Sequence, residues 1–381
     1  MNDNPDQLSS AAKLSKKAGP PQDHLSCQHD RAAGRHRGAT CVLDDNARHR
    51  HHFAVFLRQY RKMVWMRAWA QGKLIAVDAA VLMWVAHRLP LGFGRGWATV
   101  RGIIHAALGY DWLSIGTGRY PVRPMAWRAL RRLAPEQPTW QRLLWLFERY
   151  VQFSRAEWEG LALPRLVDSL PPSSAPGEVA NHSGGARRGT VHFMFHYGSL
   201  YPGVAWLSKN GIKLNWMTSD VYNRMPGLSP WIARVHNKIN DNLKFCNNGG
   251  SVIFSNKNVR EVYKKLLAGE DIVMVVDRTM PTGPAIMIDL PGPCRVPLAR
   301  GAWAALRATG AHWTVTVCEY RQGRFHIDHE RSPGWPDEPM PDLQLIRWRI
   351  SQAPQRWWAC HVLDFVPQNY DAPIVAGSFD T

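Results

Sequence analysis

The chain lacks closely paired cysteines and long apolar runs. Its six cysteines include no C-x-x-C pair, which argues against a zinc ribbon, a redox motif or a secreted disulfide framework and favours a reducing cytoplasm. The most apolar stretch, residues 74–86, is interrupted by Asp78 and is well short of the roughly 18 to 20 residues that a spanning helix needs. The N-terminus has no apolar core of a signal peptide. We therefore expect neither secretion nor a membrane-spanning segment.

Acidic residues are also scarce. Lys and Arg number 47 against 30 Asp and Glu, for a formal net charge of +17 and a pI near 9.9. This excess favours anionic partners: nucleic acid, acidic lipid headgroups or an acidic carrier protein. The 18 tryptophans favour a membrane surface, because indole rings suit a boundary between apolar and wet layers. No nucleic-acid-binding motif accompanies the charge, which disfavours that reading.

The N-terminal half divides by composition. Residues 1–52 carry almost no large apolar groups and predict a disordered tail, and its His and Cys residues fit no metal-ligand spacing, so we predict no metal site. Residues 53–170 predict a helical, basic, Trp-rich section, in which 53–140 alone has a net charge of +10. Its first helix, with basic and apolar faces, is typical of an interfacial anchor or of a helix packed on the domain. The pattern leaves both open.

Alternating strand and helix signals follow. Residues 139–160 predict a helix capped by Thr139, and 171–189 a loop. Strands are predicted at 190–195, 213–220 and 271–278, and a hairpin joins HWTVTVCEY to GRFHIDHE across RQG. Helices are predicted after His196, from Ser255 or Asn256 to Gly269, and over 297–310. The pattern predicts an α/β domain over 190–368, a mixed sheet sandwiched by helices, before a short tail at 369–381.

The strongest site signal is HYGSLY, which begins at His196. A histidine at the carboxyl end of a buried strand lies where α/β folds bind their ligands. Gly198 and Ser199 follow at a helix start, whose amides can hold an anion or a developing oxyanion. By itself such a histidine is more often structural than catalytic.

Four ordered blocks over residues 141–365 nevertheless resemble the late acyltransferases of lipid A biosynthesis, in the lysophospholipid acyltransferase-like superfamily. HFMFHYGSLYPGVAWLSKNG resembles that family's strand, H-F/Y-G-S-x-E block and helix, and NVREVYKKLLAGEDIVMVVDR its helix, strand and D-Q block. DLPGPCRVPLARGAWAALRATGAHWTVTV and ISQAPQRWWACHVLDF are similar to its F-x-G…P-x-G block and its terminal W-x-W-x-H-R block. The resemblance implies transfer of an acyl group from an acyl carrier protein or CoA thioester to a hydroxyl or amine.

The resemblance makes His196 the general base, but departs at the residue that should orient it. The family has an acid five positions later, where this chain has Tyr201. The residues that match the family's catalytic histidine and acid are therefore His196 and Tyr201. Three explanations stay open. The acceptor is an amine that needs a weaker base, another carboxylate (Asp220 or Asp277) has replaced the acid, or catalysis is lost.

Other matched positions are expected to bind substrate. Asp277 and Arg278 occupy the D-Q pair, and His361 the terminal H-R pair with Val362 in place of the arginine. The predicted substrate-binding residues are Gly198, Ser199, Asp220, Asp277, Arg278, Arg295 and His361.

These departures disfavour a lipid A acceptor and favour a specialised lipid or natural-product pathway. We expect no cofactor besides the donor thioester, an acyl carrier protein as partner, and a cytoplasmic protein peripheral to the inner membrane. The competing interpretations are a catalytically silent lipid- or carrier-binding protein on the same fold and a nucleic-acid binder. The blocks specify neither acyl chain nor acceptor.

Overall fold

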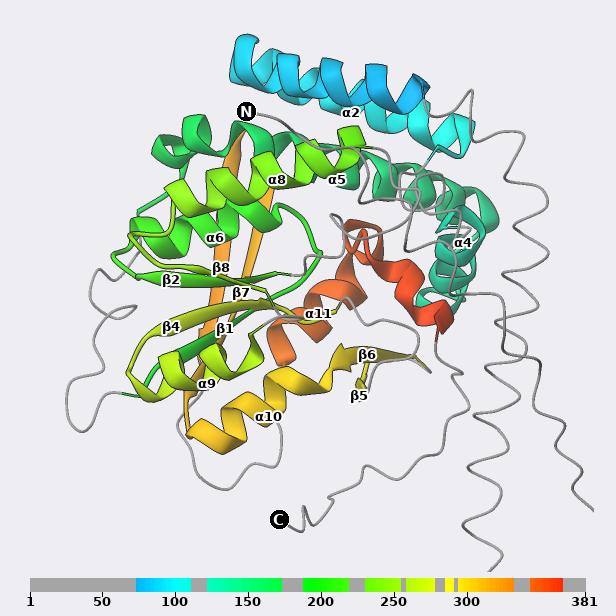
Figure 1. The fold of residues 1–381 in the computed structure, drawn as a ribbon. Helices are drawn as coiled ribbons and strands as arrows, with labels where there is room; N and C mark the ends of the chain where they lie inside the picture. Colours follow the sequence, from blue (N-terminus) through cyan, green and yellow to red (C-terminus); the bar gives the residue numbers. More distant parts are fainter. Residues whose placement is uncertain are drawn as a thin grey trace, which may run out of the picture. The chain divides into compact units, whose positions relative to one another are not determined.

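The computed structural model describes residues 73–110, 122–172, 188–218, 230–254, 258–277, 285–290, 294–331 and 343–365. Its centre is a six-stranded sheet of order β3-β2-β4-β1-β7-β8 (Figure 1). Five strands are parallel, β1 (Thr190–Met194), β2 (Leu214–Thr218), β3 (Val252–Phe254), β4 (Asp271–Val275) and β7 (His312–Arg321), and β8 (Arg324–Arg331) is antiparallel to β7. The predicted α/β class and the β7–β8 hairpin are confirmed.

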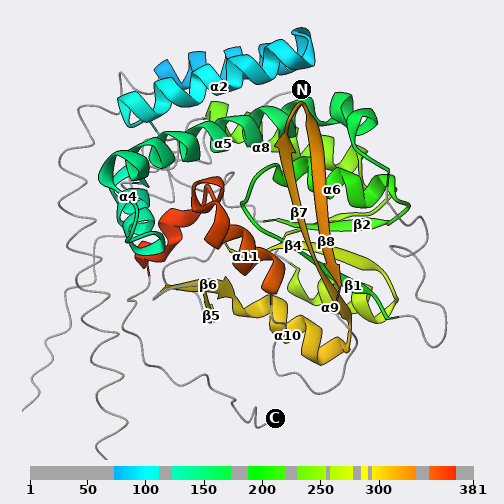
Figure 2. The ribbon, with the colours of Figure 1, turned by 180° about the vertical axis from the view of Figure 1, so that it is seen from behind.

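Helices cover both faces of this sheet, as Figures 1 and 2 show from opposite sides. One face carries α5 (Thr139–Leu166), α6 (Leu200–Lys209) and α8 (Pro230–Phe245), and the other carries α9 (Val259–Leu267) and α10 (Arg300–Thr309). Successive side chains of a strand point to opposite faces of the sheet, so they pack in turn into the two cores, and both faces are apolar. Phe193 and Met274 belong to the core on the α9–α10 side, and Met194 and Val273 to the core on the α5–α8 side.

The N-terminal helical section shares these cores. Residues 73–88 are helical and turn at Pro90 into α2 (Leu91–Leu108), which packs along α5. At the crossing, a Cβ on Gly102 would lie 2.5 Å from the Val151 Cα atom, so only glycine permits this approach. Helix α4 (Val122–Leu133) packs against the 3-10 helix η4 (Cys360–Phe365). Among the described helices, none combines the length and the apolar character needed to cross a bilayer.

The remaining elements are short. The 3-10 helix η2 (Val167–Ser169) follows α5, and β5 (Ala285–Asp289) pairs antiparallel with β6 (Arg295–Ala299) in a separate two-stranded sheet. Helix α11 (Gln344–Gln352) and the 3-10 helix η3 (Pro354–Arg356) lead into η4.

Three sequence-based boundaries are wrong. Helix α5 begins at Thr139 after the N-cap residue Pro138, and it continues to Leu166 through Pro164. Asn258, not Ser255 or Asn256, is the N-cap residue of α9. The helix expected from residue 297 begins at Arg300, because residues 295–299 form β6. Tertiary pairing with β5 overrides local helix preference in that segment.

Candidate active site

His196 and Asp277 meet at the carboxyl edge of the sheet. Strands β1 and β4 are adjacent and parallel, and their register pairs Met194 with Val275. His196 and Asp277 each lie two residues beyond the end of their strand, so the register of the two strands sets them side by side. This edge is where parallel sheets place functional side chains.

The carboxylate of Asp277 binds three N–H groups. Its Oδ1 atom lies 2.7 Å from Nδ1 of His196, and its Oδ2 atom accepts the main-chain N–H of His196 at 2.8 Å. The indole N–H of Trp357 also donates to Oδ2, at 2.7 Å. Asp277 is fully buried. An ionised carboxylate with these donors holds Nδ1 of the imidazole protonated, which leaves Nε2 as the basic nitrogen.

The turn after His196 depends on a glycine. Gly198 has φ of 55°, and a Cβ there would lie 2.4 Å from the carbonyl oxygen of Cys318 on β7. The next N–H, of Ser199, donates to that same carbonyl at 2.7 Å. Both the left-handed backbone and the missing space require glycine. The sequence predicted that these helix-start amides hold an anion or oxyanion, but in the structure the N–H of Gly198 donates to Arg356 and that of Ser199 to Cys318.

A tryptophan pair from the C-terminal segment closes over the histidine. The main-chain N–H of Trp358 donates to the His196 carbonyl at 3.0 Å, and its ring lies edge-on to the imidazole with centroids 4.4 Å apart. Trp357 is fully buried and binds Asp277. The two tryptophans belong to the last of the family-like blocks, and the sequence alone assigned them no role. Trp358 therefore packs against the imidazole, and Trp357 binds the carboxylate that holds it.

Glu159 of α5 reaches the same turn from the helical layer. Its Oε1 atom accepts a hydrogen bond from the Ser199 hydroxyl at 3.0 Å and from Nη2 of Arg95 at 2.5 Å. Burial raises the pKa of Glu159, against the opposing effects of Arg95 and Ser199. Sequence analysis missed this residue, because nothing local distinguishes Glu159 from a solvent-facing glutamate in a helix.

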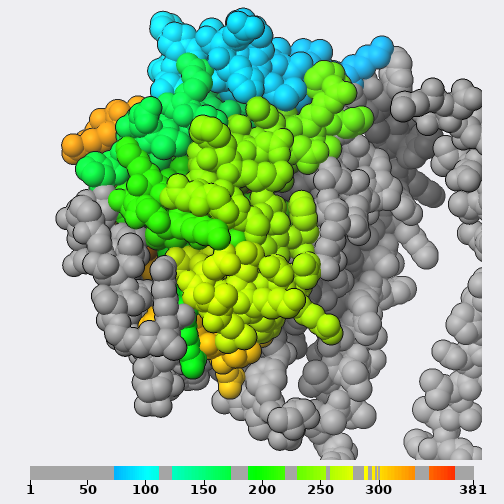
Figure 3. Space-filling model, turned by 60° about the vertical axis from the view of Figure 1, so that its left-hand side comes forward, coloured from blue at the N-terminus to red at the C-terminus, as the bar shows by residue number. Residues whose placement is uncertain are grey.

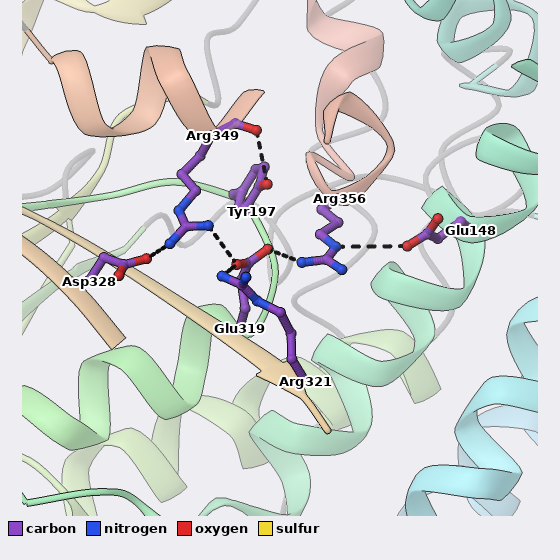
Figure 4. A network of polar contacts seen from close by, with 7 residues as sticks. All are labelled: Glu148, Tyr197, Glu319, Arg321, Asp328, Arg349 and Arg356. Carbon is purple, nitrogen blue, oxygen red and sulfur yellow. Dashed lines mark hydrogen bonds and ion pairs between the residues drawn. The ribbon is translucent and has the colours of Figure 1, made fainter. Parts of the chain in front are cut away.

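A charged network next to the turn anchors the C-terminal segment (Figure 4). Buried Glu319 of β7 forms ion pairs with Arg321, Arg349 and Arg356, and Arg349 also pairs with Asp328 of β8. The network reaches the site through the main chain, because the Gly198 N–H donates to the Arg356 carbonyl at 3.0 Å. The strands, the C-terminal segment and the catalytic turn are therefore held as one assembly.

The network also includes two side chains from other elements. The Tyr197 hydroxyl donates to the Arg349 carbonyl at 3.0 Å, and burial is the main cause that raises the pKa of Tyr197. Arg356 lies 3.9 Å from Glu148 of α5, which extends the charged contacts to the helical layer.

The other predicted site residues that the structure describes belong to α6, η4 and β6. Tyr201 is in the first turn of α6, and its ring is 2.9 Å from where a Cβ would stand on Gly160, so Gly160 leaves room for it. Nδ1 of His196, which an acid at position 201 was expected to hold, is bound by Asp277. His361 is buried in η4. Arg295 pairs with Asp289 across β5 and β6, on a half-exposed surface.

Asp220 and Arg278 lie outside the described residues. Strand β2, which precedes Asp220 in the chain, is separated from β1 by β4. Asp277, one of the two carboxylates offered as replacements for the family acid, contacts the imidazole.

The arrangement suits proton transfer. His196 has one ring nitrogen held by a buried carboxylate, and its other ring nitrogen has no hydrogen bond to any part of the chain that the structure describes. Within those same ranges, no group of three His, Cys, Asp or Glu side chains is placed to hold a metal ion. Searches with protein-family models and of curated protein sequences find no match to this chain.

Proposed function

We propose that the protein is an acyltransferase that moves an acyl group from a carrier-protein or CoA thioester to an amine or hydroxyl. The observation that carries the proposal is the pair of His196 and buried Asp277, 2.7 Å apart at the carboxyl ends of β1 and β4. Such a pair supports general-base catalysis, and the four family-like blocks supply the reaction class.

The proposed step begins with Nε2 of His196. It takes the proton of the acceptor as the acceptor's oxygen or nitrogen attacks the thioester carbonyl carbon. Asp277 stabilises the imidazolium that forms, because its carboxylate already holds the Nδ1 proton. The carbon–sulfur bond then breaks, the imidazolium returns the proton to the thiolate, and the products are the acylated acceptor and a free thiol.

The contact of Asp277 with His196 supports the explanation in which another carboxylate replaces the family acid. A phenol at position 201 would leave an imidazolium without a negative partner, which disfavours a hydroxyl acceptor. With Asp277 in that role, the base needs no help from Tyr201, and both amine and hydroxyl acceptors are chemically accessible. The excess of Lys and Arg supports an acidic carrier protein or the phosphates of CoA as the donor's binding group.

The experiment offers acyl carrier thioesters and acyl-CoA separately, each with a panel of amines and alcohols from lipid and natural-product chemistry. We expect release of free thiol coupled to acylated acceptor. His196→Ala should lower the rate by about 10²- to 10⁴-fold. Binding of the thioester without turnover would instead identify a silent carrier-binding protein.

His192→Ala is the matched control. His192 lies on the same strand and is equally buried, but its Nδ1 contacts Thr314 on the neighbouring strand. Its loss should reduce stability and leave turnover per folded molecule unchanged. Equal turnover by a folded His196→Ala protein would contradict the mechanism.

A further inference from the structure

Helix α2 has its polarity reversed. Every exposed position of this helix is glycine or an apolar residue, and the largest of them are Phe93, Val100, Ile103, Ile104 and Leu108. Phe93 and Leu108 are each 74% exposed. Water-soluble surfaces rarely present an apolar stripe of this length without polar side chains among it.

The charged residues of α2 face inward. Arg101 is 3% exposed and donates to both carboxylate oxygens of Asp78, at 2.8 and 2.6 Å, and to Glu157 at 2.8 Å. Arg95 is buried against Glu159. The charged side chains of α2 therefore lie on the side that faces α5. The exposed residues on the outward side are all apolar or glycine.

The preceding helix continues the same surface. Over residues 73–88 the exposed apolar side chains are Leu74, Val77, Val81 and Trp84, which recur at helical spacing on one face. Asp78 and Arg101 lie 12 and 11 residues from Pro90 on its two sides and pair with each other, so this helix runs antiparallel to α2. The exposed apolar stripes of the two helices therefore lie alongside each other. Figure 3 shows the hairpin (blue) on the outer side of the green helices.

The charges that frame this face are basic. Lys73, His87 and Arg88 are exposed at the ends of the first helix, and no acidic side chain is exposed on either helix of the hairpin. The preceding segment, residues 53–72, also contains no Asp or Glu and carries Arg58, Arg61, Lys62 and Arg67. An apolar centre with basic edges and an outward tryptophan is the composition of helices that lie in a lipid interface.

We propose that the outward face of the hairpin 73–108 docks on an anionic lipid bilayer, with both helices lying in the plane of the interface. Phe93, Val100, Ile104 and Leu108 enter the acyl boundary, and Lys73 and Arg88 contact the headgroups. The charge pattern favours lipid over a second copy of the chain, because two such faces would bring basic ends together without any acid between them. The proposal does not depend on the acyltransferase activity.

The test measures binding of the full chain to vesicles of phosphatidylcholine with and without phosphatidylglycerol, by co-sedimentation. Val100→Glu/Ile104→Glu should weaken binding to the anionic vesicles by at least ~10-fold, since two apolar side chains no longer leave water. The matched control is Val259→Glu/Leu267→Glu on α9, which has the same charge change at residues 50% and 62% exposed, on the other face of the sheet. It should bind within ~3-fold of the parent, because only the general charge has changed.

Val100→Ser/Ile104→Ser repeats the test without new charge and should also weaken binding, in case the Glu pair disturbs folding. Three results would overturn the proposal: equal loss for both Glu pairs, no loss for either α2 pair in folded protein, or equal binding to neutral and anionic vesicles. Sedimentation without lipid should show a monomer. A dimer that Val100→Glu/Ile104→Glu dissociates would assign the face to a second copy.

Discussion

Two buried ionic groups in this protein differ in what they can do. In the helical hairpin, Arg101 binds Asp78 and Glu157, so both carboxylates face a permanent cation. At the sheet edge, Asp277 faces His196 and two N–H donors. A guanidinium never releases its proton, whereas an imidazole exchanges one near neutral pH. The first group can only hold structure, and the second can also do chemistry.

The comparison extends to how each region uses its apolar residues. The sheet follows the usual pattern, with mostly apolar strands between helices and the His196–Asp277 pair just beyond the ends of two of them. The hairpin buries its ion pairs beside apolar side chains such as Leu82 and Val85, and it also exposes a stripe of apolar side chains. Whether a surface of this molecule carries polar or apolar side chains therefore depends on what that surface contacts.

The largest expected effect breaks the pair at the sheet edge. Asp277→Asn offers one acceptor oxygen to three N–H donors. The NH₂ group of the asparagine must therefore face either the imidazole or the two N–H groups that Oδ2 now accepts. If it faces the imidazole, the tautomer reverses and Nε2 no longer accepts a proton. We expect kcat to fall by about 10⁴-fold in folded protein. Asp289→Asn, in a half-exposed pair, is the control. Near-parental kcat would show that Asp277 does not orient the base.

The next effect breaks the pair in the hairpin. Asp78→Asn leaves the buried Arg101 cation with less negative charge, and we expect unfolding free energy to fall by roughly 3 kcal/mol at neutral pH. Turnover per folded molecule should stay unchanged, in contrast to Asp277→Asn. Asp241→Asn, in an exposed pair, should change stability by less than ~1 kcal/mol.

The same substitution has a defined pH dependence. Burial works against ionised Asp78, but Arg101 and His105 hold its folded-state pKa well below the ordinary value of about 3.9. The contribution of Asp78 is therefore complete above that unfolded value and is lost as pH falls through the folded pKa. The difference between parent and Asp78→Asn should shrink below about pH 4 in denaturant titrations. A constant difference down to pH 2 would contradict this assignment.

A smaller effect tests the turn that joins the site to the sheet. Gly198→Ala places a methyl group against the Cys318 carbonyl at positive φ, and should cost roughly 1–3 kcal/mol of stability. It should also lower kcat, since the turn positions His196. Gly323→Ala is the matched control, because φ is 82° there but nothing lies within 4 Å of the new methyl. Equal losses in the two variants would mean that the space at Gly198 is unimportant.

The smallest effect is expected at Tyr201. Because Asp277 already holds Nδ1 of His196, Tyr201→Phe should lower kcat by less than about 10-fold toward both amines and alcohols. Tyr201→Glu should leave the ratio of amine to alcohol rates unchanged. A loss comparable to that of Asp277→Asn would place the phenol in the catalytic machinery.

Local pattern predicted β1, β2, β4, β7 and β8 and the helices α5, α6, α9 and α10, because alternating burial and helical spacing are properties of neighbouring residues. It did not predict β3, β5, β6, α8 or α11. It misplaced the N-cap and the end of α5 and the starts of α9 and α10, and the β5–β6 pairing decides the start of α10. For the site, it identified His196 from its position after a buried strand. It left Asp277 as one of two carboxylates and missed Glu159 entirely.

The sequence alone determined the α/β alternation, the position of His196 at a strand end and the excess of positive charge, since each follows from local composition and periodicity. Only the tertiary structure decided that Asp277 meets His196, because residues 81 positions apart are joined by the register of β1 on β4. It also decided that α2 turns Arg95 and Arg101 inward. Periodicity shows that a helix has two faces, but the acidic partners on α5 and on residues 73–88 determine which face is buried.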